Sequence, residues 1–251
     1  MGLFSKLKEL FTFQFEVLED APALTPDQDR ALAVGAVYAA EGGLPINAPT
    51  MTDPKTAAKL LSGAWDISGP TDVDAVYEFL LHQGHRAYHA IVAPRVEEAI
   101  AAGRRSRALR DQHKAQAAQD AAARGLDPQR ASDWYDYWTA SAIAGGHAEL
   151  VDPLPASIAA WDAARVVQLS RLLLDAGYVT PERAWSAMSE AAEMSRPAYS
   201  SWKEFGDAFV VGRAFWSAGN RNPIDQDVRK FKDAVDNLLT TEGSPWLRLA
   251  F

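Results

Sequence analysis

AWDAARVVQLSRLLLDAGY (residues 160–178) is the stretch that decides the fold. Its apolar residues recur every three or four positions, and Gly177 follows them where a helix commonly ends. The pattern predicts a helix over about 156–176. At about 100° per residue, however, Asp162 and Arg165 fall inside its apolar face. Because a buried charge without a partner is unfavourable, both charges need partners in the folded protein.

The same helical periodicity runs along most of the chain, and no strand–turn–strand pattern competes with it. Capping residues before proline mark several helix starts. We therefore expect an all-α fold of about eight helices. The clearest are expected over about 25–41, 53–62, 71–83, 156–176, 181–195, 201–218 and 224–239. Residues 1–18 change from a helical to an alternating pattern, which leaves helix and strand both open.

Composition excludes several classes of protein. The chain has 251 residues, of which 48% are hydrophobic and 23% charged, as is typical of soluble globular proteins. It has no apolar run long enough to span a membrane and no recognisable secretory signal, so a cytoplasmic location is expected. The absence of cysteine excludes disulfides and thiolate metal sites. A net charge of −8 argues against broad nucleic-acid binding, and no motif indicates a cofactor.

Residues 101–132 differ from the rest of the chain in composition. They contain seven Lys or Arg residues against three Asp, and few large apolar side chains. Such a segment has helix propensity but little surface to bury, which predicts a solvated helical arm or linker. A basic docking surface for an acidic partner is the alternative.

A second arginine shares the environment predicted for Asp162 and Arg165. In the helix expected over 201–218, Arg213 lies at the edge of an aromatic face. We predict that Asp162 and Arg165 contact each other and that Arg213 approaches them. Trp161, Trp202 or Trp216 is expected to lie against this group. One carboxylate cannot satisfy two guanidinium groups, so the group is either a structural network, which we favour, or an anion pocket.

The stretch EFLLHQGHRAYH (78–89) carries three histidines in helical register. They are His82, His85 and His89. Because apolar residues cluster on the opposite face, the pattern favours a solvated stripe, and no metal site is predicted. A metal site at this spacing is the weaker alternative. If Gly84 ends the helix, His85 and Arg86 instead act at a helix junction.

Several of these blocks resemble the bacterial domain-of-unknown-function family 1266. The family pattern combines Trp-Asp-x-x-Arg, Gly-Tyr, Ser-Trp and Gly-Arg-x-x-Trp. It falls on Trp161, Asp162 and Arg165; Gly177 and Tyr178; Ser201 and Trp202; and Gly212, Arg213 and Trp216. AWDI (64–67), GHRAY (84–88) and SPW (244–246) look like further blocks. The resemblance spans about 60–246, with 101–132 as a variable basic insertion. It implies a bacterial source and no particular activity.

For domains, we expect one all-α domain over 25–251 and a separate N-terminal segment, 1–24, outside the resemblance. For function, we expect a cytoplasmic interaction module, of adaptor or toxin-neutralising type, whose partner is another protein. A small anion is a second candidate ligand. The alternative is an enzyme acting on an anionic small molecule or a phosphodiester, with His85 as acid or base. The candidate binding residues are Asp162, Arg165, Arg213, Trp161, Trp202, Trp216, Tyr178 and Arg86.

Overall fold

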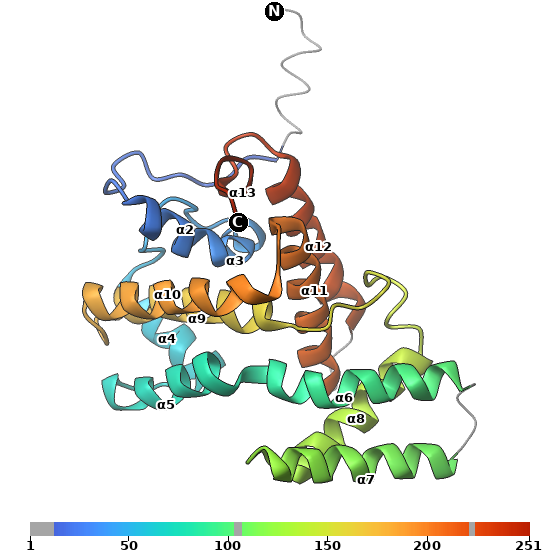
Figure 1. The fold of residues 1–251 in the computed structure, drawn as a ribbon. Helices are drawn as coiled ribbons and strands as arrows, with labels where there is room; N and C mark the ends of the chain where they lie inside the picture. The colour runs from blue at the N-terminus through green and yellow to red at the C-terminus, as the bar shows by residue number, and fades with distance from the viewer. Residues whose placement is uncertain (1–12, 103–106, 221–223) are drawn as a thin grey trace, which may run out of the picture.

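The computed structural model describes residues 13–102, 107–220 and 224–251. Over these ranges the chain forms helices and no strand, which confirms the all-α prediction (Figure 1). The α-helices are α2 (Pro26–Val34), α3 (Ala36–Gly42), α4 (Pro54–Trp65), α5 (Val73–Glu78), α6 (Gly84–Ala101), α7 (Arg107–Ala123), α8 (Pro128–Ile143), α9 (Ala159–Asp175), α10 (Pro181–Ser195), α11 (Trp202–Gly219), α12 (Ile224–Thr240) and α13 (Pro245–Arg248). Short 3₁₀ turns are η1 (Pro70–Asp72) and η3 (Arg196–Ala198), and η2 (Phe79–Gln83) is a π-helical turn.

Helix α9 lies at the centre of the arrangement. It runs beside α10, while α11 and α12 cross this pair steeply (Figure 1). Helix α2 packs on α10, α4 and α6 contact α9 from the other side, and α7 and α8 pack with α6. Fourteen of the residues in α9 are buried, so the helix is covered all round. A charged side chain near its start therefore lies in the interior.

The predicted caps hold the helix ends. Thr25 forms a capping box with Gln28, and the hydroxyls of Thr180 and Ser201 accept backbone N–H groups at the starts of α10 and α11. Gly177 adopts φ +71° after α9, where the sequence predicts a helix-ending glycine. These local signals explain why helix boundaries in the second half agree with the sequence within a few residues.

The number of helices differs from the expected eight. The helix expected over 25–41 is divided at Gly35, where a side chain would overlap Val167 of α9. The segment 101–132, predicted as one helical arm or linker, contains α7 and the beginning of α8. Residues 13–18 are neither helix nor strand, and residues 1–12 lie outside the described residues.

Helix α7 lies against α6 and α8, and the side chains it buries are His113, Ala117 and Ala121. An ion pair joins Lys114 to Asp136 of α8. The helical part of the prediction is therefore confirmed, whereas the segment is packed on its neighbours. Among the described residues, no helix combines the length and apolar composition needed to cross a membrane.

Candidate functional site

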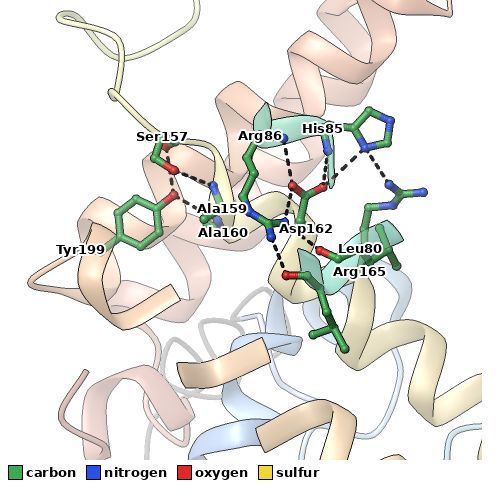
Figure 2. A network of polar contacts seen from close by, with 10 residues as sticks. Leu80, His85, Arg86, Ser157, Ala159, Ala160, Asp162, Arg165 and Tyr199 are labelled. Carbon is green, nitrogen blue, oxygen red and sulfur yellow. Dashed lines mark hydrogen bonds and ion pairs between the residues drawn. The ribbon is translucent and has the colours of Figure 1, made fainter. Parts of the chain in front are cut away.

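Asp162 lies in the first turn of α9 and is completely buried. The start of this helix is held by Tyr199, whose hydroxyl accepts the Ala160 N–H (3.0 Å) and donates to the Ser157 carbonyl (3.0 Å; Figure 2). This anchoring supports the first turn of α9, from which the Asp162 carboxylate points toward the beginning of α6.

The Asp162 carboxylate caps α6 from outside that helix. Its Oδ1 accepts the backbone N–H of His85 (3.0 Å), and its Oδ2 accepts the backbone N–H of Arg86 (3.0 Å) and Arg86 Nη1 (3.2 Å; Figure 2). These two N–H groups, in the first turn, have no partner within the helix, and a negative charge is favourable there. The charge on the apolar face of α9 is therefore a helix cap supplied by a distant segment.

The backbone before α6 leaves space for the Asp162 carboxylate at the start of that helix. The π-helical turn η2 ends at Gly84, and Arg86 closes it by donating Nη1 to the Leu80 carbonyl (2.7 Å) and Nη2 to the Leu81 carbonyl (2.5 Å). Gly84 has φ +63°, and a Cβ at this position would overlap the Asp162 carboxylate and the Arg86 guanidinium. His85 and Arg86 therefore lie at a helix junction, the position expected for them if Gly84 ended the preceding helix.

Asp162 is ionised in this environment. Burial alone would raise the pKa of its carboxyl, but hydrogen bonding to His85 and Arg86, together with the positive charge of Arg86, holds the pKa below its usual range. The Arg86 guanidinium is its counter-ion. We refer to Asp162, Gly84, His85 and Arg86 as the α6 cap.

His85 connects the α6 cap to Arg165. Its Nδ1 lies 3.0 Å from Arg165 Nη1 and 3.4 Å from Asp162 Oδ1, and its ring packs against Phe79 and Trp134. The predicted Asp162–Arg165 ion pair is thus wrong, because the imidazole lies between the two side chains. Burial lowers the pKa of His85, which keeps the ring neutral. Since Arg165 donates to Nδ1, the ring hydrogen is on Nε2.

Arg165 and Arg213 lie over aromatic rings. The Arg165 guanidinium carbon is 4.7 Å from the Trp65 ring centroid and 5.3 Å from that of Trp161. The Arg213 guanidinium is 4.6 Å from Trp216, 5.2 Å from Phe231 and 5.7 Å from Trp161. Trp161 is common to both, so the predicted approach of Arg213, with Trp161 and Trp216 against it, is confirmed.

Tyr38 of α3 completes this group. Burial raises the pKa of its hydroxyl, against the opposing charges of Arg165 and Arg213. Its ring packs edge-on against Phe231 and tilts against Trp161. We call the full set the arginine–aromatic cluster. Its members are Tyr38, Trp65, Trp161, Arg165, Arg213, Trp216 and Phe231.

Other predicted positions lie elsewhere. Trp202 stacks on Trp246 (5.1 Å between centroids), and the Tyr178 hydroxyl donates to the Ser68 carbonyl (3.3 Å). No contact is found between either residue and the α6 cap or the two arginines in the described part of the chain. Of the three tryptophans expected as alternatives against Arg213, Trp161 and Trp216 lie there, and Trp202 packs on Trp246.

The histidine stripe is also different from the prediction. His82 is exposed, but His85 and His89 are buried, because the π-helical turn and Gly84 change the register between them. The solvated stripe is therefore wrong for two of its three members. No three His, Asp or Glu side chains gather as potential metal ligands within the described ranges.

A family model described as protein of unknown function, DUF1266, matches residues 60–251. The chain belongs to the DUF1266 family. No curated protein and no solved structure matches it. The match covers the α6 cap and every member of the arginine–aromatic cluster except Tyr38, which precedes it in the chain. The DUF1266 description supplies no activity.

Sequence reasoning missed four contributors to the site, namely Tyr38, Trp65, Phe231 and the carbonyl groups of η2. Trp65 belongs to the AWDI block, so the DUF1266 resemblance contained a signal for it. Tyr38 had none, since a tyrosine in an apolar helix is more often a core residue. Phe231 comes from the strongly amphipathic α12, where its position predicts burial without naming its neighbours.

Proposed function

We propose that this DUF1266 protein is a cytoplasmic binding module that takes an anionic group of a partner, a carboxylate or a phosphate, at the arginine–aromatic cluster. The observation that carries the proposal is the state of Arg165. Its hydrogen bond within the described residues goes to the neutral imidazole of His85, and no described carboxylate forms an ion pair with it. A half-buried guanidinium without a counter-ion is suited to an external anion.

The surroundings of Arg165 support this role. Arg165 is only partly buried, so part of the residue is open to solvent. Arg213 brings a second positive charge to the same region, since both guanidinium groups lie over the Trp161 ring. The rings of Trp65 and Trp161 hold the guanidinium in place and lower the local dielectric constant, which strengthens a charge-assisted hydrogen bond. Adaptor or toxin-neutralising activity would use such a site to recognise an acidic or phosphorylated segment of a protein.

Sulfate provides a direct test. We expect it to raise the melting temperature of the wild type, since a ligand that binds only the folded state stabilises by about 2.7 kcal/mol at 100 times its Kd. For a protein of this size that energy corresponds to roughly 5–10 °C. Sulfate also stabilises proteins in general by exclusion from their surface. The informative quantity is therefore the difference between the wild type and Arg165→Met at equal sulfate and ionic strength.

Arg183→Met is the matched control. Arg183 also lies over an aromatic ring, Tyr77 (5.4 Å), but it is paired with Asp74 (3.0 Å). The sulfate-dependent shift should persist in Arg183→Met and fall to the general salt effect in Arg165→Met. Equal shifts in all three proteins would contradict the proposal.

An enzyme acting on an anionic small molecule or a phosphodiester is the second candidate, favoured by the contact between His85 and Arg165. In the observed geometry the neutral ring presents Nε2–H only as a hydrogen-bond donor, so His85 would have to take up a proton before it could act as a general acid. Turnover of a phosphodiester by the wild type and its loss in His85→Asn, with sulfate binding kept, would support this candidate over a pure binding module.

A further inference from the structure

One atom of the α6 cap, Nδ1 of His85, contacts Arg165 of the arginine–aromatic cluster. This atom has one lone pair and two neighbours that make opposite demands on it. Arg165 Nη1, at 3.0 Å, is a donor, whereas Asp162 Oδ1, at 3.4 Å, is an acceptor. Because a neutral Nδ1 accepts and a protonated Nδ1 donates, His85 can bond only one of the two neighbours at a time.

Resting on the proposed function, we infer that His85 is the positioning residue of the anion site and couples anion binding at Arg165 to proton uptake. In the neutral form His85 holds the Arg165 guanidinium by accepting its Nη1–H. When solvent delivers a proton to Nδ1, the new N–H turns to Asp162 Oδ1. Arg165 Nη1 then loses its acceptor and becomes available to an external anion.

The charges around His85 determine whether proton uptake and anion binding favour or oppose each other. From α9 it faces Asp162 and Arg165, from α8 it faces Arg130, and within α6 the side chain of Arg86 shares the Asp162 carboxylate. Phe79 of η2 and Trp134 of α8 enclose the ring and contribute no charge. An imidazolium beside two arginines is unfavourable unless Asp162 and an added anion compensate it. Proton and anion therefore favour each other's binding.

The predicted result is that sulfate binds more tightly as the pH falls from about 6.5, the ordinary pKa of histidine, toward the lower pKa that burial gives His85. Sulfate is chosen because it does not itself titrate in this range. Its Kd, measured by calorimetry at constant chloride from about pH 7.5 to about pH 4.5, should fall continuously as His85 takes up its proton. The total change should approach the coupling factor, which is about fivefold or more in the usual range. The slope should not exceed about tenfold per pH unit for a single proton.

Two variants isolate His85. In His85→Asn the side-chain carbonyl remains an acceptor near Nδ1 but does not titrate, so its sulfate affinity should be independent of pH. In His82→Asn an exposed histidine four residues from Glu78 is removed, and the wild-type pH dependence should remain. A His85→Asn protein with the wild-type pH dependence would overturn the inference.

A measurement on the wild type avoids any loss of folding in the variant. By reciprocity, saturating sulfate should raise the pKa of His85, followed by NMR, by about 0.7 units for a fivefold coupling. An unchanged pKa would also overturn the inference. If sulfate binds through Arg165 with the same Kd at every pH, only the coupling fails, whereas no sulfate binding at any pH would remove the proposed function with it.

Discussion

At position 84 any side chain is incompatible with the α6 cap, for two separate reasons. The backbone is in the left-handed region, and the space a Cβ would occupy is filled by Asp162 and Arg86. We predict that Gly84→Ala lowers the free energy of unfolding by more than the roughly 1–2 kcal/mol that a left-handed alanine costs. The loss of unfolding free energy beyond that backbone cost arises from displacement of the Asp162 carboxylate. Urea unfolding measures the total loss.

Gly125 supplies the control for this prediction. It has a similar φ of +70°, but a Cβ there would meet nothing within 4 Å. Gly125→Ala should therefore lose only the backbone contribution. Equal losses for the two variants would show that the close approach to Asp162 is not under strain.

For the individual residues of the site, only part of the arrangement could be predicted from the sequence. The burial of Asp162 follows from its position within the apolar arc of α9, and the approach of Arg213 follows from its aromatic face. The partner of Asp162 does not, because it is 77 positions earlier in the chain while Arg165 is only three later. Local spacing predicts pairs within one helix. A helix cap supplied by a residue far away in the sequence has no local sequence pattern.

Among the elements, α7 and α9 should differ most in local stability. Helix α7 buries three described side chains, two of them alanines, whereas α9 buries fourteen. We predict that backbone amides of α7 exchange with solvent through local opening, much faster than those of α9. Hydrogen exchange followed by mass spectrometry would measure this, and comparable protection of both helices would contradict it.

Periodicity and caps suffice for the helices of the second half, because each carries its own start signal and a continuous apolar face. They fail between 73 and 101. There the π-helical turn η2 depends on Arg86 bonding to Leu80 and Leu81, and α6 depends on Asp162. The helix junction is thus determined by contacts between segments, and this is why His85 and His89 were predicted on the wrong face.

For the whole molecule, buried histidine makes stability depend on pH. Burial lowers the pKa of His89 from 6.5 to about 4, so the unfolded chain takes up a proton in this window that the folded protein does not. Stability therefore falls as the pH drops from 6.5 toward 4, by up to roughly 3 kcal/mol from this group. His89→Leu should remove that contribution, as urea unfolding at pH 7 and pH 4.5 would show.

His82→Gln is the reference for this experiment. The His82 side chain is 56% exposed, so its replacement should leave the pH dependence of the wild type in place. Parallel curves for the wild type and His89→Leu would mean that acid destabilises the protein through other groups.

Trp246 of α13 stacks on Trp202 and donates its indole N–H to the Ala33 carbonyl of α2 (2.8 Å), 213 positions earlier in the chain. This bond has a consequence for biosynthesis. At about 5–20 residues per second, a ribosome needs about 10–40 seconds to reach Trp246 after Ala33 has been added. For that time the nascent α2 lacks this partner, so the contact between α13 and α2 forms only after nearly the whole chain has been synthesised.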